Sequence, residues 1–285
     1  MATSLNPRED FRRLFFYRTL ITLVLLPLGL WAIHLGGAVF AWVIALILAL
    51  ASWEYTQLFR ACGYQPASAF LIGGVVLLAL GRSINGFESA PWILCLVVFA
   101  STAYHLLAYE RGRNQAATDL AISLAGFFYI GWLGAYLISV RELPDGEWWL
   151  LTVLPAIWFA DMGAYLVGNA IGRHPLTRRV SPKKTWEGYL AGLASAVLAT
   201  ALLAIAWQAL AAPMPEINAR SGALLGFVIA LLAPIGDLGE SLIKRQAGAK
   251  DSGKILPGHG GMFDRIDSWL WAAPIGFYLI LWLLK

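Results

Sequence analysis

Long apolar runs recur along the whole chain with only short polar segments between them, and they limit what this sequence can fold into. A helix that crosses a membrane needs about 20 mainly apolar residues. The chain has 285 residues, of which 59% are hydrophobic and 13% are charged, whereas a soluble domain carries about 45–50% apolar and about 25% charged residues. The sequence therefore predicts an all-α, polytopic integral membrane protein in a lipid bilayer. A soluble domain is excluded, and no nucleic acid partner is expected.

Nine apolar runs come close to the length of a membrane-crossing helix. They are Leu20–Leu35, Ala38–Trp53, Ala67–Gly81, Ala90–Tyr109, Leu120–Val140, Trp148–Ile171, Gly188–Ala212, Ser221–Gly236 and Ser268–Leu284. The first run follows several arginines but has no convincing small-residue cleavage site, so we interpret it as an uncleaved span. We expect amino-terminal membrane helices over 1–114 and a catalytic membrane region over 115–285, with polar loops at 173–187 and 237–267.

The positions of the basic residues predict the orientation of these helices. Loops rich in Lys and Arg stay on the cytoplasmic side of a membrane. With nine spans and an internal amino terminus, 17 of the 21 Lys and Arg residues lie inside and 4 lie outside. If the short run Ala67–Gly81 did not cross, the numbers would be 12 and 9. We therefore expect about nine spans in a bacterial-type inner or plasma membrane, with both polar loops in the cytoplasm.

Carboxylates inside apolar runs need a polar partner, because inserting one charge into a membrane costs about 2.5–3.5 kcal/mol. Asp161 lies near the middle of its run, too far from either end for a short side chain to reach water. We interpret it as facing a substrate or a metal, with a bond to a neighbouring helix as the alternative. Glu54 lies near the end of its run, where it is expected to reach the membrane interface.

Two acidic pairs flank the last polar loop. They are Asp237 with Glu240 and Asp264 with Asp267. Residues three apart on a helix point to the same side, so each pair can share a cation. Four carboxylates at one end of a helix bundle would repel one another without cations between them, and oxygen ligands suit Mg²⁺.

Basic residues lie between these pairs on a segment that Gly and Pro interrupt, so that ammonium and backbone N–H groups can surround a polyphosphate. They are Lys244, Arg245, Lys250 and Lys254. Carboxylate-bound Mg²⁺ beside basic residues is typical of phosphoryl or nucleotidyl transfer. His259 stands between two glycines, which would let its backbone approach a ligand closely; the alternative is a structural histidine.

The segment Ser181–Gly188 places two ammonium groups and two hydroxyls just before a long apolar helix. Its polar residues are Ser181, Lys183, Lys184 and Thr185. A hydroxyl cap and the positive end of a helix dipole suit phosphate groups. The alternative is that the two lysines act only as a topology signal or contact lipid headgroups.

The segment Ser241–Asp267 resembles the signature of the phosphatidate cytidylyltransferase, or CDP-diacylglycerol synthase, family. The elements that carry the resemblance are Lys244-Arg245, Lys250-Asp251, His259-Gly260-Gly261 and Asp264-Arg265-Ile266-Asp267. Ser181–Gly188 and the Asp161-x-x-Ala164-Tyr165 element are also similar to the middle portion of that family. The first 110 or so residues are similar to it only in their hydrophobic character.

The resemblance implies an enzyme that converts CTP and phosphatidate into CDP-diacylglycerol and pyrophosphate with Mg²⁺. It also implies a second, monovalent cation such as K⁺, and a homodimer. The metal ligands expected are Asp161, Asp237, Asp264 and Asp267. The catalytic residues expected are Lys244, Arg245, Lys250, Asp251 and His259, of which the first three would bind the triphosphate or the leaving pyrophosphate. The substrate-binding residues expected are Ser181, Lys183, Lys184, Thr185 and Arg265.

Two other functions compete with this interpretation. A CTP-dependent polyprenol or dolichol kinase would transfer the γ-phosphoryl group to an alcohol, which must be deprotonated, whereas a phosphomonoester is largely ionised at pH 7. A secondary transporter also carries carboxylates within the membrane. The charges of this sequence gather at one end of the helices instead of at the midplane, which argues against transport.

Overall fold

The structure is a computed structural model that describes residues 7–211, 214–253, 255 and 260–285. Within these residues it is helical, with a single isolated β-bridge between Pro175 and Thr185. The elements are α1 (Pro7–Leu35), α2 (Gly37–Ala61), α3 (Ser68–Asn85), α4 (Ala90–Glu110), α5 (Ala116–Gly126), η1 (Phe127–Trp132), α6 (Tyr136–Arg141), α7 (Gly146–Ile171), α8 (Trp186–Leu210), α9 (Ala219–Gln246) and α10 (Phe263–Leu283).

Eight helical segments of the described chain are long and apolar enough to cross a membrane, instead of the nine predicted. Seven of them are α2, α3, α4, α7, α8, α9 and α10, and the eighth is Ala116–Arg141, which joins α5, η1 and α6. The first predicted span, Leu20–Leu35, is the exception. Its apolar part, Thr22–Leu35, covers roughly 21 Å at 1.5 Å per residue, less than the roughly 30 Å of a hydrocarbon core. The prediction of an all-α, multi-pass membrane protein is confirmed.

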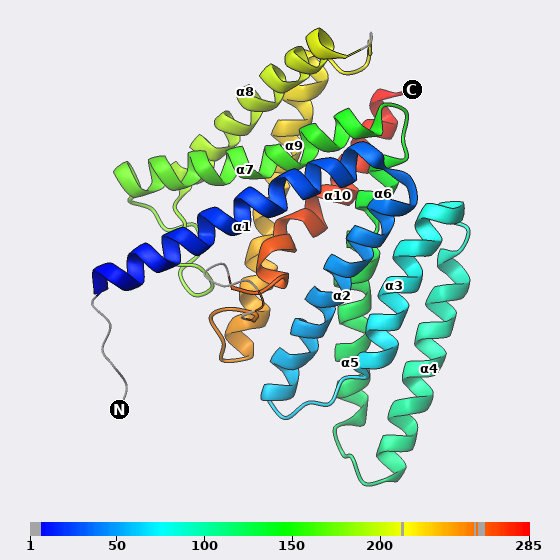
Figure 1. The fold of residues 1–285 in the computed structure, drawn as a ribbon. Coiled ribbons are helices and arrows are strands. Elements are labelled where there is room, and N and C mark those ends of the chain that lie inside the picture. The colour runs from blue at the N-terminus through cyan, green and yellow to red at the C-terminus, as the bar shows by residue number, and fades with distance from the viewer. Residues whose placement is uncertain (1–6, 212–213, 254, 256–259) are drawn as a thin grey trace.

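The helices form two groups that α10 joins. Helices α2 to α5 pack side by side in one group, and α7, α8 and α9 pack against one another in the other. Helix α10 contacts α2, α6, α7 and α9, so it touches both groups. Figure 1 shows the α7 and α8 pair running at a steep angle to α2, α3 and α4. The start of α10 therefore lies where the two groups meet.

Small residues let α7, α8 and α9 approach closely. A Cβ atom added to Gly163 of α7 would clash with Ser195 of α8, and one added to Gly226 of α9 would clash with Thr200 of α8. Helix association within membranes depends on such close packing, because apolar side chains gain little by leaving lipid. The tight α7–α8–α9 layer therefore provides a rigid support for the residues at its ends.

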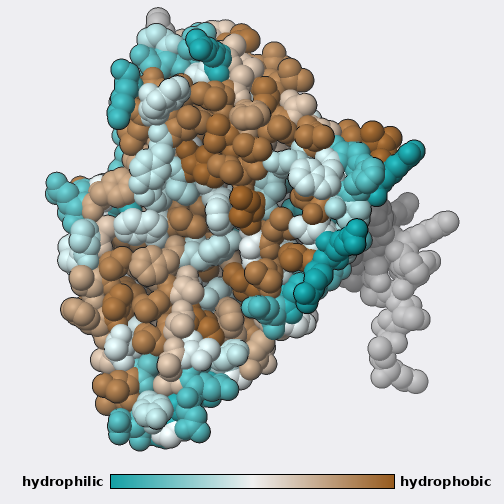
Figure 2. Space-filling model, turned by 180° about the vertical axis from the view of Figure 1, so that it is seen from behind, coloured by the Kyte–Doolittle hydropathy of each residue, from teal (hydrophilic) through white to brown (hydrophobic). Residues whose placement is uncertain are grey.

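The outer surface of the helices is apolar. Large hydrophobic side chains such as Leu46, Phe99 and Leu202 are exposed, and Figure 2 shows hydrophobic residues over much of one face, with hydrophilic residues toward the margins. A soluble protein rarely leaves so large an apolar area in water. The distribution is the one expected of helices that lie in lipid.

Helix α9 continues ten residues beyond the predicted end of its apolar run, Gly236. Asp237 and Lys244 therefore lie on a helix, and the polar segment predicted from Asp237 begins only after Gln246. The pair Glu240–Lys244 supports the extension at i, i+4 spacing. Gly248, with φ of 65°, ends the helix, because glycine adopts this conformation without steric cost.

Successive connections between the membrane-crossing helices lie in turn at opposite ends of the fold. In Figure 1 the connections after α2, α4, α7 and α9 lie toward the lower and left side, and those after α1, α3, α6 and α8 lie toward the upper and right side with the carboxyl end. The turn near 111–114, where the two sequence regions were divided, belongs to the first set.

This alternation predicts that two reporter fusions will face different compartments. Three helices, α8, α9 and α10, separate the 172–185 connection from Lys285. A reporter inserted between Arg178 and Arg179 should be cytoplasmic, and one fused after Lys285 should be external. Cysteine accessibility at the same two positions provides an independent measurement. Labelling of both positions from one side would contradict the arrangement.

Candidate active site

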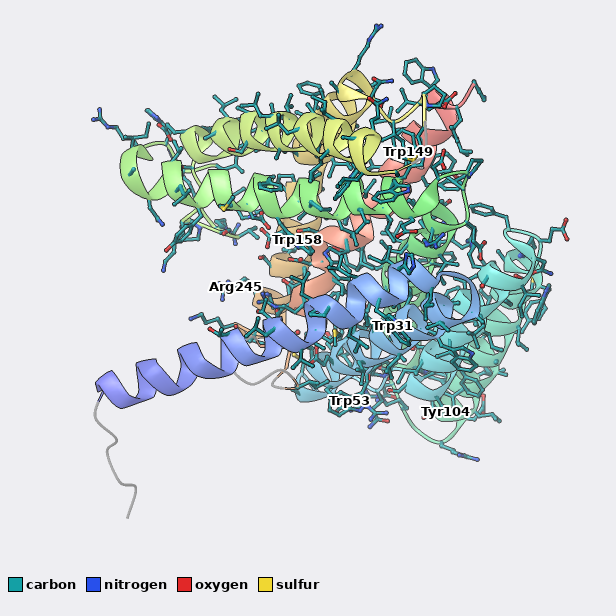
Figure 3. The ribbon with its side chains drawn as sticks, turned by 45° about the horizontal axis from the view of Figure 1, so that its top comes forward. Trp31, Trp53, Tyr104, Trp149, Trp158 and Arg245 are labelled. Atoms are coloured by element: carbon teal, nitrogen blue, oxygen red, sulfur yellow. The ribbon has the colours of Figure 1, made fainter. Side chains whose placement is uncertain are left out.

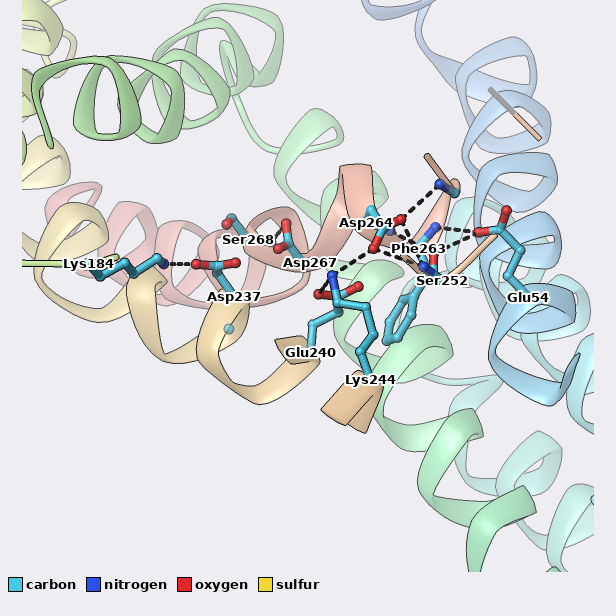
Figure 4. Close-up of polar contacts among 12 residues, drawn as sticks. Glu54, Lys184, Asp237, Glu240, Lys244, Ser252, Phe263, Asp264, Asp267 and Ser268 are labelled. Carbon is cyan, nitrogen blue, oxygen red and sulfur yellow. Dashed lines mark hydrogen bonds and ion pairs between the residues drawn. The ribbon is translucent and has the colours of Figure 1, made fainter. Parts of the chain in front are cut away.

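Charged residues from three elements meet in a row at one end of the fold. Figure 4 shows Lys184 from the α7–α8 connection, Asp237 and Glu240 from α9, and Asp264 and Asp267 from α10. These positions are distant in the sequence, and the meeting of α9 and α10 brings them together. The row lies on the same side of the fold as the basic connections.

Three carboxylates form a cluster that could hold a metal ion. One oxygen each from Asp237, Glu240 and Asp267 lies within 4.8 Å of the others. Glu240 is fully buried, and its Oε1 has no hydrogen-bond partner among the described residues. A buried carboxylate oxygen without a partner is costly, and a cation would satisfy it. The donor set consists only of oxygen, which suits Mg²⁺; these residues fit that ion.

The α9 segment that carries two of these carboxylates is anchored from the opposite group of helices. The Tyr129 hydroxyl donates to the carbonyl oxygen of Gly236 at 3.1 Å, and the Trp271 indole donates to Tyr129 Oη at 3.3 Å. Tyr129 lies in η1, a wide helical turn of a kind often found at functional sites. This link holds α9 in place immediately before Asp237.

Lys184 is the cation nearest to the cluster. Its ammonium group forms an ion pair with Asp237. Burial lowers the pKa of the Lys184 ammonium, while the carboxylates of Asp161 and Asp267 act in the opposite direction. Asp161, on α7, is thus close enough to interact electrostatically with Lys184 and Asp267.

Lys244 lies between two carboxylates at the other end of the row. Its Nζ is 2.5 Å from Glu240 Oε2 and 2.7 Å from Asp264 Oδ1. Asp264 also accepts hydrogen bonds at Oδ2 from the amides of Gly261 at 2.8 Å and Ser252 at 3.0 Å. The structure therefore groups Asp267 with Asp237 and Glu240, and it surrounds Asp264 with donors.

The row has more negative than positive groups. Four carboxylates, with Asp161 near them, face two ammonium groups, those of Lys184 and Lys244. Like charges that lie close together in a poorly solvated site repel strongly. A bound divalent cation would reduce this imbalance and is the largest local charge such a site can take.

Five other residues predicted to act here are exposed. They are Lys183, Arg245, Lys250, Asp251 and Arg265. None of them forms an ion pair with another residue of the described ranges. In the view of Figure 3, Arg245 lies between the ribbons of α1 and α7. Their charges are therefore accessible to a ligand that enters from this side.

The hydroxyls of the α7–α8 connection take structural positions. Thr185 caps α8, since its Oγ1 accepts a hydrogen bond from the Gly188 amide at 3.2 Å. The Ser181 amide donates to Thr177 Oγ1 at 3.1 Å. Glu187 accepts from the amide of Arg173 at 3.2 Å and lies 2.5 Å from His174 Nδ1. These contacts fix the backbone that presents Lys184.

Two predicted residues, Lys254 and His259, lie outside the described residues.

Two described residues belong to the site but are absent from the expected ligand set. Glu240 completes the carboxylate cluster, and its spacing from Asp237 was the signal for it. Glu54 does not reach the membrane interface; it is buried and accepts hydrogen bonds from the α9–α10 connection. No motif in the sequence pointed to that contact.

Comparisons with known proteins cover nearly the whole chain. The cytidylyltransferase family matches residues 16–283. A phosphatidate cytidylyltransferase of Synechocystis sp. is 36% identical over 279 residues, which is 88% of this chain and 91% of that protein. A phosphatidate cytidylyltransferase of Pseudomonas aeruginosa is 35% identical over 284 residues, which is 93% of this chain and 96% of that protein.

A relative with lower identity also matches most of the chain. The chloroplastic phosphatidate cytidylyltransferase 5 of Arabidopsis thaliana is 29% identical over 282 residues, which is 86% of this chain and 66% of that protein. The matches include the amino-terminal helices, where the sequence alone showed only hydrophobic character. With a charged row at the end of an all-helical membrane fold, this chain belongs to the cytidylyltransferase family.

Proposed function

We propose that this protein transfers a cytidylyl group from CTP to phosphatidate, which gives CDP-diacylglycerol and pyrophosphate. The observation that carries the proposal is the cluster of Asp237, Glu240 and Asp267 next to the ammonium groups of Lys184 and Lys244. Both substrates are anionic phosphates, so their approach needs positive charge more than it needs a base. Relatives that match most of the chain and carry this activity in their names support the proposal.

Asp237, Glu240 and Asp267 would hold Mg²⁺, with Asp161 close by. When bound, the ion supplies positive charge that offsets the phosphate oxygens and the charge on the leaving group. Asp264 is already bonded to Lys244 and two amides, so its role would be to hold Lys244 and the α9–α10 connection. Binding of a second, monovalent cation such as K⁺ stays a prediction. Assembly into a homodimer also stays a prediction.

The basic residues would neutralise and orient the two substrates. Lys184 and Lys244 lie beside the cluster, where the reacting phosphates meet, while the exposed Arg245 and Lys250 would bind the triphosphate and the departing pyrophosphate. A phosphate oxygen of phosphatidate attacks the α-phosphorus of CTP, and the bond to the β-phosphate oxygen breaks as pyrophosphate leaves. The attacking phosphate, with a second pKa of about 6, is largely ionised at pH 7. No general base is needed.

The site would face the cytoplasm. Thirteen Lys and Arg residues lie in or beside the connections after α2, α4, α7 and α9, and four lie at the opposite end of the fold. Under the positive-inside rule, this asymmetry favours the first set as the cytoplasmic side. CTP would then enter from the cytoplasm, and the protein would reside in a bacterial-type inner or plasma membrane.

A labelling experiment tests the proposed reaction against the kinase alternative. Purified protein is incubated with phosphatidate, Mg²⁺ and CTP labelled in either the α- or the γ-phosphate. The α-label should enter the chloroform-soluble product, and the γ-label should be recovered only as water-soluble pyrophosphate. Entry of γ-label into lipid would indicate a kinase. Absence of both labels from lipid, with folded protein, would refute nucleotidyl transfer.

The metal assignment predicts the effect of removing one ligand charge. Glu240→Gln and Asp267→Asn keep the side-chain volume but weaken cation binding, so activity at limiting Mg²⁺ should fall by about 100-fold and recover in part at high Mg²⁺. Mg²⁺ titration of turnover measures the shift. Glu110→Gln, an exposed change at the end of α4, is the control. Near-normal Mg²⁺ dependence in both variants would disprove the assignment.

The two lysines of the α7–α8 connection should differ in effect. Lys184→Ala leaves Asp237 without its ion-pair partner and should lower kcat/KM at least about tenfold, or about 1.4 kcal/mol. Lys183→Ala removes an exposed charge and should alter only the apparent affinity for one phosphate substrate. Initial rates over a grid of CTP and phosphatidate concentrations separate the two effects. If neither variant changed these rates, the segment would be only a topology signal.

A further inference from the structure

Glu54 reaches the candidate active site from the amino-terminal group of helices. It lies near the end of α2 and is 1% exposed. Its Oε2 accepts a hydrogen bond from the Phe263 amide at 2.9 Å and another from the Ser252 hydroxyl at 3.2 Å. These donors are about 200 positions further along the chain. Glu54 therefore links α2 to the segment between α9 and α10.

Ser252 continues the link to Asp264. The Ser252 amide donates to Asp264 Oδ2 at 3.0 Å, and the Asp264 amide donates to the Ser252 hydroxyl oxygen at 3.3 Å. Asp264 in turn accepts from Lys244 at 2.7 Å. Figure 4 shows these contacts as one chain of hydrogen bonds from Glu54 to Lys244. A displacement of Glu54 would thus change the positions of Asp264 and Lys244 through Ser252.

The two donors to Glu54 lie at opposite ends of one stretch of chain. Ser252 stands at its beginning, and Phe263 opens α10 at its end. A single carboxylate oxygen therefore holds Ser252 and Phe263 together. Holding these two residues in place before a ligand binds reduces the conformational entropy that binding would otherwise cost.

The backbone around Glu54 is shaped to receive the carboxylate. A Cβ atom at Gly253 would clash with Glu54, and one at Gly261 would clash with both Glu54 and Ser252. The Phe263 ring packs edge-on against Tyr55, with ring centroids 6.0 Å apart, so an apolar contact lies beside the polar one. The glycines permit the close approach, and the aromatic pair keeps α2 against α10.

Glu54 is separate from the proposed metal ligands. The acidic cluster found among the described residues contains Asp237, Glu240 and Asp267, but not Glu54. Burying a carboxylate is expensive unless donors compensate; the Ser252 and Phe263 donors compensate Oε2, while the buried Oε1 has no hydrogen-bond partner among the described residues. Hydrogen bonds to a charged acceptor are roughly twice as strong as neutral ones. This arrangement suits a strong anchor better than a reacting group.

We propose that Glu54 is a positioning residue, which holds Ser252 and Phe263 so that Asp264 and Lys244 stay beside the proposed metal-binding carboxylates. It touches no substrate. The inference rests on the proposed function, because Lys250, two residues before Ser252, is taken to bind the CTP triphosphate. Loss of the anchor should therefore act on the use of CTP more than on phosphatidate.

Two substitutions of Glu54 test the anchor. Glu54→Ala removes the acceptor and should lower kcat/KM for CTP at least about tenfold, with KM for phosphatidate within about twofold. Glu54→Gln keeps an oxygen that can accept both hydrogen bonds, so it should stay within about threefold of the unaltered protein. Equal loss in Glu54→Gln and Glu54→Ala would overturn the proposal, because the negative charge itself would then be required.

A double-mutant cycle with Ser252→Ala tests the route of the effect. If Glu54 acts through Ser252, the double variant should lose about as much as the more impaired single variant. Losses that multiply would show that the two residues act independently and would refute the chain of contacts. If Glu54→Ala fails to fold, Ser252→Ala alone should still lower kcat/KM for CTP at least about tenfold, and a smaller loss would count against the proposal.

The control is Ser123→Ala, which breaks another buried contact within the α2–α5 group of helices. Ser123 Oγ accepts from the Ala67 amide at 2.8 Å, away from the α9–α10 connection. Thermal unfolding in detergent should change similarly in both alanine variants, while only Glu54→Ala should alter CTP use. Equal kinetic loss in both would reduce Glu54 to a structural residue. Failure of the unaltered protein to transfer α-label would refute the proposed function instead.

Discussion

Compensation of carboxylate charge is the constraint on which the site depends. Glu240 is fully buried and Asp264 is nearly so, and neither could remain charged there without partners. Lys244 lies between the two, and Lys184 pairs with Asp237. The α7–α8 connection, the end of α9 and the start of α10 must therefore keep their relative positions. The excess of acidic groups leaves a place for a cation.

The fold meets this requirement with two kinds of contact. Small residues bring α7, α8 and α9 together, and α10 contacts both groups of helices. Polar contacts then act at particular points: Tyr129 holds Gly236, and Glu54 holds Ser252 and Phe263. The amino-terminal helices are thus more than a membrane anchor, since Glu54 on α2 contacts the site.

The arrangement suits a reaction between two anions. The buried part of the row would bind the cation, and the exposed Arg245, Lys250 and Lys183 stand on the side from which a charged nucleotide can enter. Such a site needs no strong base, because the attacking phosphate is already ionised. An enzyme that phosphorylated an alcohol would need a group to take up its proton.

The sequence by itself determined the fold class, the approximate bounds of eight helices and the family, because hydropathy runs and closely spaced motifs are local properties. It also paired Asp237 with Glu240 from their spacing. It predicted nine spans, whereas eight helical segments of the described chain are long and apolar enough to cross a membrane. The end of α9 was placed too early, because the polar residues after Gly236 continue the helix.

Only the tertiary structure decided how the charged residues are partnered. Asp264 and Asp267 are three residues apart on one helix, yet Asp267 lies with the carboxylates of Asp237 and Glu240, while Asp264 accepts hydrogen bonds from Lys244 and loop amides. Glu54 looked like a residue at the end of a helix, and its contact with Ser252 spans 198 positions. Such partnerships depend on how α2, α9 and α10 pack, and no local pattern encodes that packing.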